Sequence, residues 1–281
     1  MVGAAVTVLV SGYGSIGRRH AVNLRAMGHE VIIHDPAVTS GAWVPMLNVG
    51  LSLPLVSHVL ICSPARVHAE QAIAALGAGK EVFVEKPLAC TVPEGDAILA
   101  AAAAAGKIVA VGYQWRAHAA LSSFRQYLRT LRRPGRIKLL YHGDKSTWPG
   151  RCYEDLLLEC SHELDALRWL VGAHVSLVDA MLAPRGSAAK LWYDGPGLTA
   201  TVELDWGAPR ARREWIATGP NGTVGWQFDG RDAVDAAQLS ATYREEIIAW
   251  LAGRPYGTAE DGLLVLQDIA RARDLAGATA P

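Results

Sequence analysis

Three glycines near the N-terminus have the spacing of a phosphate-binding turn. The run Gly12-Tyr13-Gly14-Ser15-Ile16-Gly17 follows an apolar segment and opens an amphipathic one. In a GxGxxG turn between a strand and a helix, the first glycine permits the tight turn, the second lets the backbone approach a pyrophosphate, and the third lets the helix pack on the strand. The helix N-terminus then offers free N–H groups to the phosphates. All six residues are predicted to bind a dinucleotide, and a glycine turn without a ligand is the structural alternative.

An acidic residue stands where a nucleotide ribose would be recognised. Asp35 ends the second expected strand, eighteen residues after Gly17. A carboxylate at this position accepts hydrogen bonds from ribose hydroxyls and repels a 2′-phosphate, which favours NAD over NADP. Asp35 could instead only start the turn that follows it, and Arg18 or Arg19 could still bind a phosphate.

Lys86 is a candidate for electrostatic catalysis. It follows an expected strand, at the carboxyl end where parallel sheets bind ligands, and Pro87 restricts the turn that presents it. An ammonium group there can stabilise an alkoxide as it develops. By position alone, a solvated lysine before a helix is the alternative interpretation.

His162 is a candidate for acid–base chemistry. It lies in a segment of helical periodicity, Leu156 to Val171, and Glu159 three residues earlier shares its face. An imidazole, with an unperturbed pKa of about 6.5, can take up or return a hydroxyl proton. Without other context, a histidine on a helix is more often structural. Cys160 and His142 could be imagined with it around a metal, but the spacing matches no zinc signature, and no metal site is predicted.

Alternating strand and helix patterns position the residues of the first part. Such an alternation is typical of a parallel sheet with helices on both faces. The stretch 36–54 holds three prolines and two glycines and shows no clear helix, so one element is expected to be shortened or missing. The expected strands are 6–11, 30–34, 56–63, 81–84 and 108–111, and the expected helices are 16–27, 67–76 and 93–105.

After residue 116 the pattern changes to strands separated mainly by turns. The expected strands are 137–142, 175–182, 189–193, 198–206, 213–218 and 222–228, and the expected helices are 118–130, 156–171, 243–251 and 258–275. The sequence therefore predicts an α/β Rossmann domain over residues 1–116. An α+β domain with an open, mainly antiparallel or mixed β-sheet is predicted over residues 117–281.

Composition argues against several classes of protein. The 281 residues, 51% of them hydrophobic, can bury a sizeable core, and 27 basic residues balance 27 acidic ones. No net field therefore attracts nucleic acid or an anionic membrane. The apolar N-terminus has no basic leader, the alanine-rich stretch 97–105 is shorter than the roughly 20 residues of a membrane span, and the four cysteines form no CxxC pair. We expect a cytoplasmic protein with a small-molecule ligand, binding neither nucleic acid nor membrane.

An ordered series of segments is similar to the glucose–fructose oxidoreductase, inositol dehydrogenase and MocA (Gfo/Idh/MocA) family. The segments are GYGSIGRRH, ICSPARVHAEQAIAALGAGKEVFVEKPLA, VGYQWR, ECSHELDALRWLVG, TYREEIIAWL and EDGLLVL, and they span most of the chain. The resemblance implies a Rossmann domain followed by a domain built on an open sheet. Because the outer face of that sheet often forms the oligomer interface in the family, a homodimer or homotetramer is implied.

The resemblance also implies catalytic roles. Lys86, in the family's EKP motif, would lie near the nicotinamide and the substrate hydroxyl, and His162 falls where the family keeps its acid–base histidine. The commonest pattern has an aspartate four residues before that histidine. Here that residue is Leu158, and Glu159 is the expected replacement, with Asp165 structural. The expected catalytic set is thus Lys86, Glu159 and His162.

Further residues are expected beside the cofactor and the substrate, although several could equally be packing residues. The segment 113–116 matches the family's link between the domains, and aromatic faces suit the C–H surfaces of sugars. The additional cofactor residues are Ser63, Pro64, His68, Glu85 and Lys86. The expected substrate residues are Lys86, Arg116, Lys145, Trp148, Tyr153 and His162.

Together these features predict an oxidoreductase that uses NAD, with NADP as the alternative. It would move a hydride between nicotinamide and a secondary alcohol or ketone of a sugar, cyclitol or sugar derivative. Two other functions fit the same fold. One is transient oxidation by bound NAD that enables elimination or glycoside cleavage without net redox change. The other is an inactive NAD-binding regulatory protein, favoured by Leu158 and by the sequence Tyr-Glu-Asp at 153–155, where the family has a glycine run.

Overall fold

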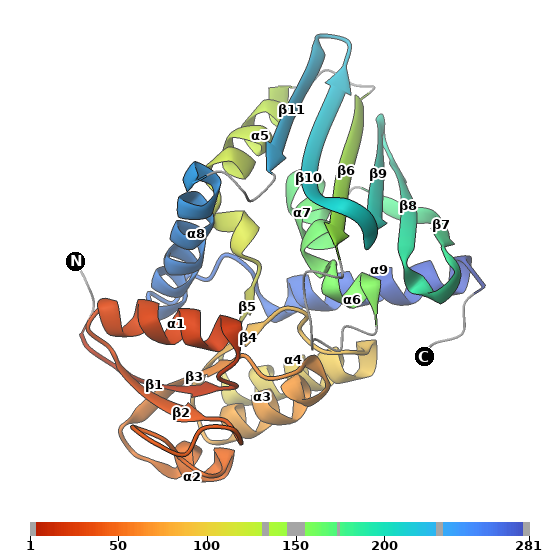
Figure 1. The fold of residues 1–281 in the computed structure, drawn as a ribbon. Coiled ribbons are helices and arrows are strands. Elements are labelled where there is room, and N and C mark those ends of the chain that lie inside the picture. Colours follow the sequence, from red (N-terminus) through yellow and green to blue (C-terminus); the bar gives the residue numbers. More distant parts are fainter. Residues whose placement is uncertain (1–3, 131–134, 145–154, 173–174, 229–232, 278–281) are drawn as a thin grey trace. The chain divides into compact units, whose positions relative to one another are not determined.

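The computed structural model describes residues 4–130, 135–144, 155–172, 175–228 and 233–277 (Figure 1). The chain divides into two compact units. The first comprises residues 1–114 and 242–266, and the second comprises residues 115–241 and 267–281. The sequence places one boundary near residue 116, but it gives no indication that the chain returns to the first unit at residue 242.

A five-stranded parallel sheet forms the centre of the first unit. Most residues of its strands are buried and apolar, as expected for a parallel sheet covered on both faces, and the edge strand β2 is the most exposed. Figure 1 shows helix α1 on one side of this sheet and helices α3 and α4 on the other. The strand order is β2 (Glu30–His34), β1 (Thr7–Ser11), β3 (Val56–Ile61), β4 (Glu81–Glu85) and β5 (Val109–Gly112).

The helices of the first unit follow the expected ranges closely. The stretch from 36 to 54, rich in proline and glycine, contains only a six-residue helix, so the expected shortening is observed. The α-helices are α1 (Ser15–Ala26), α2 (Leu47–Ser52), α3 (His68–Gly77) and α4 (Val92–Ala105), and the 3-10 helix η1 covers Ala65–Val67. Helix α4 begins with a capping box, in which the Thr91 side chain and Glu94 bond each other's backbone N–H groups.

A six-stranded mixed sheet forms the centre of the second unit. Neighbouring strands are antiparallel except for β6 and β9, which are parallel. This sheet, together with the parallel one, confirms the predicted fold class. The strand order is β11 (Gly222–Phe228), β10 (Gly207–Gly219), β6 (Gly135–Asp144), β9 (Leu198–Asp205), β8 (Ala188–Gly195) and β7 (Ser176–Leu182).

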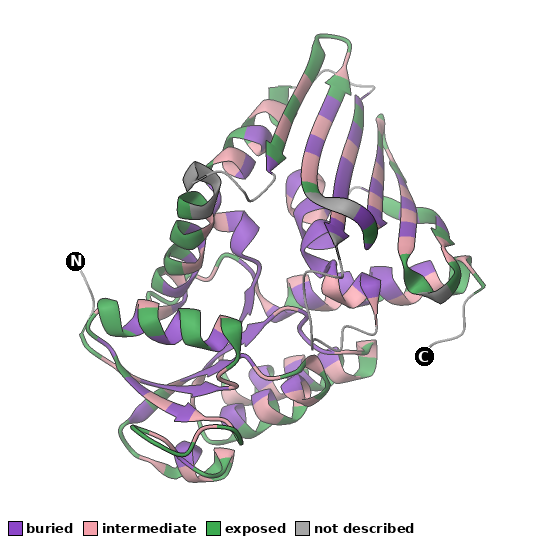
Figure 2. Cartoon of the chain, viewed as in Figure 1, coloured by how far each residue is buried: buried purple, intermediate pink, exposed green. Residues whose placement is uncertain are grey.

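Buried and half-buried residues alternate along the central strands of this sheet (Figure 2). Such a period of two is typical of strands with one face on a core. The remaining α-helices are α5 (Ala119–Thr130), α6 (Leu156–Glu159), α7 (Ser161–Val171), α8 (Ala233–Leu251) and α9 (Ala259–Leu275). The remaining 3-10 helices are η2 (Gln114–Ala117) and η5 (Pro184–Gly186). No helix among the described residues is long and apolar enough to cross a lipid bilayer.

Two expected helices differ from the observed ones. The single helix expected over 156–171 is wrong, because the chain breaks at Cys160 into α6 and α7. Helix α8 begins ten residues before the expected start at Tyr243. Its first part belongs to the second unit, and its last part belongs to the first unit, where Ile247 and Trp250 are buried against strands of the parallel sheet.

Candidate functional site

The glycine turn after β1 has no room for side chains at two of its three glycines. Gly12 has a φ of 90°, and a Cβ there would lie 2.5 Å from the Ser63 nitrogen. A Cβ on Gly17 would lie 2.0 Å from the Gly12 carbonyl oxygen. At Gly14, in contrast, a Cβ would meet nothing within 4 Å. Gly12 and Gly17 therefore cannot carry a side chain without a clash. Gly14, the position expected to face a pyrophosphate, has empty space beside it.

The N-terminus of α1 is suited to bind an anion. Its N-cap, Gly14, provides no side-chain cap, and the first turn contains no acidic residue. The N–H groups of this turn and the positive end of the helix dipole are therefore available to phosphate groups. Arg18 extends from the same turn, and its Nε donates to the Tyr13 carbonyl oxygen at 3.1 Å. The glycine turn and this helix start fit the pyrophosphate of a dinucleotide.

Asp35 lies just after β2 and is hydrogen bonded to the glycine turn. Its Oδ2 accepts the Tyr13 N–H at 2.6 Å, and its Oδ1 accepts the Ala37 N–H at 2.8 Å. A carboxylate has about four acceptor sites. The half-buried Asp35 can therefore hold the turn and still accept hydrogen bonds from ribose hydroxyls.

His68 connects the loop after β3 with the turn after β4. Its ring is 1% exposed, with Nδ1 2.8 Å from the Pro87 carbonyl oxygen and Nε2 2.8 Å from that of Ser63. Burial lowers the pKa of His68 from its usual value, although both carbonyls and Glu85 act in the opposite direction. The ring contacts protein backbone, so its geometry is that of a residue that positions the loop. Pro64, in the same loop, is exposed.

Lys86 follows the last residue of β4, at the carboxyl end of the parallel sheet. It is half-buried, and its peptide bond to Pro87 is cis. Glu85 before it is buried: its Oε2 accepts the Lys86 N–H at 3.3 Å, and its Oε1 lies 2.6 Å from His20 Nε2. The Glu85 carboxylate therefore contacts the backbone of the candidate catalytic lysine.

His162 lies in the first turn of α7 and is 8% exposed. Glu159 is half-buried and ends the preceding helix, α6, which Asp155 caps by accepting the Leu157 and Leu158 N–H groups at 2.9 and 3.1 Å. The expectation that Glu159 and His162 share a helix face rested on one continuous helix. The break at Cys160 removes that basis, although both residues remain in the second unit, on consecutive helices.

Two buried ion pairs hold the helix that carries His162. Arg116 donates to Asp165 through Nε at 3.0 Å and Nη2 at 2.6 Å, a two-bond contact. Arg213 Nε donates to Glu163 Oε1 at 2.5 Å. Arg116, expected at the substrate, is thus engaged with Asp165. The role of Arg213 could not be found from the sequence, because its partner is fifty residues away and no periodicity links the two.

The expected residues divide between the two units. The glycine turn, Asp35, His68 and Lys86 lie in the first unit, whereas Arg116, Glu159 and His162 lie in the second. Lys145, Trp148 and Tyr153 lie outside the described residues.

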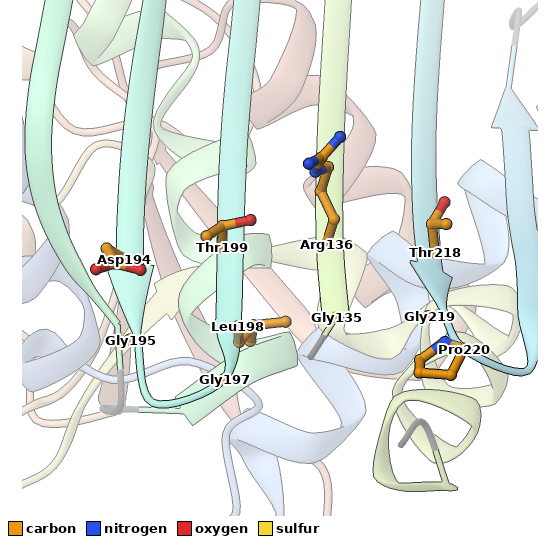
Figure 3. A pocket seen from close by; sticks show the side chains of 10 residues that line it. All are labelled: Gly135, Arg136, Asp194, Gly195, Gly197, Leu198, Thr199, Thr218, Gly219 and Pro220. Carbon is orange, nitrogen blue, oxygen red and sulfur yellow. The ribbon is translucent and has the colours of Figure 1, made fainter. Parts of the chain in front are cut away.

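A surface hollow of roughly 660 Å³ lies at the turn end of the mixed sheet (Figure 3). Its lining includes Arg136 of β6, Asp194 of β8 and Thr218 of β10. Among the residues that the structure describes, none of those expected to bind cofactor or substrate lines it.

Sequence comparison finds that part of the chain is similar to oxidoreductases. Residues 46–113 match the model of the Gfo/Idh/MocA oxidoreductase family, which has an NAD-binding Rossmann fold. An inositol 2-dehydrogenase of Cereibacter sphaeroides is 34% identical over 177 residues, which cover 58% of this chain and 53% of that protein. The chain thus spans about half the length of that relative.

Solved structures share the fold over almost the whole chain. A probable dehydrogenase from Thermotoga maritima superposes with a TM-score of 0.85 at 19% identity, covering 97% of both chains. The WlbA dehydrogenase from Bordetella pertussis, in complex with NADH and UDP-GlcNAcA, superposes with a TM-score of 0.82 at 20% identity, covering 96% of both. At these identities the likeness shows the fold alone. In sequence over part of its length, and in fold over nearly all of it, this chain is similar to oxidoreductases of the Gfo/Idh/MocA family.

Proposed function

We propose that this protein is an NAD-dependent dehydrogenase or reductase acting on a CH–OH group of a sugar, cyclitol or sugar derivative. The observation that carries the proposal is the glycine turn, open at Gly14 and bonded through Tyr13 to Asp35. The names of the relatives support the substrate class, since one is an inositol dehydrogenase and another structure holds a sugar nucleotide. The acidic Asp35 supports NAD over NADP.

The chain's own residues have separate tasks in this proposal. The N–H groups at the start of α1 would hold the pyrophosphate, and Asp35 would bind the adenosine ribose. Bound NAD would supply the hydride acceptor, or in the reverse direction the hydride donor. Ser63, Pro64 and His68 would shape the loop beside it.

Three residues would act on the substrate. His162 would take up the hydroxyl proton during oxidation and return it during reduction. The Lys86 ammonium would stabilise the negative charge on the substrate oxygen, and Glu159 would orient one of these groups. Arg116, through its pair with Asp165, would contribute by fixing α7.

Substitution of the two central residues tests this assignment. In Lys86→Met and His162→Asn, turnover should fall by at least about 100-fold, the usual effect of losing an acid–base or charge-stabilising group. NADH affinity should change little, because the predicted pyrophosphate and ribose contacts are intact. Turnover is measured as NADH formation or consumption with a panel of sugars and cyclitols, and affinity by energy transfer from tryptophan to NADH.

Lys107→Met is the matched control. Lys107 lies before β5, at the amino end of the parallel sheet, and pairs with Glu81. Its loss should leave turnover unchanged. Near-normal turnover in both active-site variants would contradict the residue assignment, and absence of NADH binding by the wild type would contradict the proposed function. Product formed without net NADH would instead indicate the elimination or glycoside-cleavage reaction.

The assembly and location of the protein stay predictions. A homodimer or homotetramer through the mixed sheet and a cytoplasmic location are expected from the resemblance and the composition. The half-buried positions of this sheet carry ion pairs, with Glu203 of β9 bonded to Lys138 of β6 at 2.6 Å and to Lys190 of β8 at 2.8 Å. An interface there would be polar.

A further inference from the structure

Three titratable side chains form a buried cluster in the first unit. They come from distant parts of the chain: His20 from α1, Glu85 from the end of β4, and Glu246 from α8. Their nitrogen and oxygen ligand atoms lie within 4.8 Å of one another. The three residues are 0%, 6% and 3% exposed, respectively. Water therefore does not screen the charges of this group.

Glu246 is the member whose charge is least compensated. Within the described residues, neither of its carboxylate oxygens has a hydrogen-bond partner, although both are buried. An ionised carboxylate is strongly unfavourable in such surroundings, and a second carboxylate nearby adds repulsion. Burial, and then the charge of Glu85, raise the pKa of Glu246 well above its usual value. A proton on Glu246 relieves both unfavourable contributions.

The geometry fits a proton better than a metal ion. His20 Nε2 and Glu85 Oε1 are 2.6 Å apart, which is a hydrogen-bond distance. Two ligands of one tetrahedral zinc ion would lie roughly 3.3 Å apart, given metal–ligand bonds of about 2.0–2.1 Å. A metal would have to break the contact between His20 and Glu85.

We propose that Glu246 is a positioning residue, held as the neutral acid at neutral pH, so that it places no second negative charge beside Glu85. Glu85 can then keep accepting the Lys86 N–H through Oε2, at 3.3 Å, without repulsion from a second carboxylate. Gly112 of β5 leaves space for this carboxylate, because a Cβ on Gly112 would lie 2.8 Å from Glu85 Oε2. The catalytic consequence rests on the proposed function, in which Lys86 stabilises charge on the substrate oxygen.

The surroundings of the cluster contain no cation bonded to Glu246 among the described residues. Burial, together with Glu85 and Glu246, raises the pKa of the neighbouring Cys62 thiol, so this thiol is also neutral. Arg19 is exposed, and its guanidinium lies over the Tyr243 ring. Among the described residues, the titratable groups shown near Glu246 are His20 of α1, Cys62 after β3 and Glu85 of β4, while the Tyr243 ring of α8 contacts His20.

The proposal predicts a specific dependence of stability on pH. Because the pKa of Glu246 is higher in the folded than in the unfolded chain, folding takes up a proton between these two values. The free energy of unfolding therefore falls as pH rises through that window, which begins near the unfolded pKa of about 4.3. Glu246→Gln keeps the shape and an N–H donor but cannot ionise. The melting temperature of this variant minus that of the wild type should therefore increase by roughly 2–4 °C for each unit that the pH rises within the window.

Glu245→Gln is the matched control, because it removes one carboxylate from the exposed neighbouring position of the same helix. The melting temperature of Glu245→Gln should change with pH in the same way as that of the wild type. An infrared band of a protonated carboxylic acid should be present in the wild type at neutral pH and in Glu245→Gln, and should be lost in Glu246→Gln.

Turnover provides the functional readout. At pH 7, Glu246→Gln should keep near-normal kcat, whereas Glu246→Ala, which leaves a cavity beside Glu85, should lose kcat with little change in NADH affinity. In the wild type, kcat should also fall at alkaline pH, and Glu246→Gln should remove that fall. If Glu246 had only a structural role, its replacement by glutamine would not remove the fall of kcat at alkaline pH.

Three results would overturn the proposal. The first is Glu246→Gln failing like Glu246→Ala at pH 7, which would mean that the ionised carboxylate is needed. The second is absence of the infrared band. The third is stabilisation by added Zn²⁺ or Mn²⁺ that chelation reverses and Glu246→Gln abolishes, which would indicate a metal site. Normal turnover in Lys86→Met would instead contradict the proposed function, and the infrared and melting results would still decide whether Glu246 is neutral.

Discussion

The Asp35 carboxylate holds the glycine turn, and in the proposed function it would also bind the ribose. It accepts the Tyr13 and Ala37 N–H groups and so fixes the glycine turn beside the end of β2. Its remaining acceptor sites can bind ribose hydroxyls. Loss of this side chain should therefore affect both the shape of the turn and the choice of cofactor.

We expect Asp35→Ala to bind NADH at least about tenfold more weakly, because a hydrogen bond to a charged group contributes roughly 1.5–3 kcal/mol. The ratio of NADPH to NADH affinity should rise, since the repulsion of a 2′-phosphate is removed and Arg18 remains nearby. Energy-transfer titrations with both nucleotides measure the two affinities. Asp96→Ala, at an exposed position of α4, is the control. Unchanged affinities in Asp35→Ala would show that the carboxylate does not contact the nucleotide.

At the scale of helices and strands, the ion pairs around α7 are the features on which the candidate site depends most. In Arg213→Met, the Glu163 carboxylate, with 1% of its side chain exposed, loses its partner. Breaking a buried pair in this way typically destabilises a protein by about 3–5 kcal/mol. We therefore expect a clear decrease in the urea midpoint of the second unit.

The neighbouring Arg212 provides the comparison. Its side chain is 47% exposed and pairs with Glu214, so Arg212→Met should change the free energy of unfolding by only about 0–1 kcal/mol. Urea unfolding followed by circular dichroism measures both variants. Equal effects of the two substitutions would show that the buried pair gives no special stability.

The elements found from the sequence were those with a local signal. The range predicted for β2 matches the observed one, and the glycine turn lies between β1 and α1 as expected, because strand periodicity and glycine spacing are local properties. The break at Cys160 was missed because apolar periodicity continues across it. Glu246 and Arg213 were missed because their partners are far away in the sequence and only the folded chain brings them together.

At the scale of the whole molecule, the parallel sheet depends on a residue near the far end of the chain. Trp250 is 5% exposed, and its ring centroid lies 5.4 Å from that of Phe83 and 5.2 Å from that of His58. Burial of a tryptophan in such a core contributes strongly to stability. The core of the first unit is therefore incomplete without α8.

We expect Trp250→Ala to destabilise the first unit by about 3–5 kcal/mol, the usual effect of truncating a buried aromatic side chain. Thermal unfolding, with NADH binding as the report on the first unit, checks this. Trp192→Ala, at a half-buried position of β8 in the second unit, should leave NADH binding unchanged. If Trp250→Ala unfolds at the wild-type temperature, α8 does not stabilise the first unit.

The return of residues 242–266 to the first unit also bears on how the chain matures during synthesis. A ribosome releases β1 to β5 long before Ile247 and Trp250, which complete their core. The second unit also includes a late segment, because Asp268 of α9 accepts hydrogen bonds from Arg168 and Tyr193. Domains usually fold one after another as they emerge. For this chain we therefore expect that neither core is complete until α8 and α9 have been synthesised.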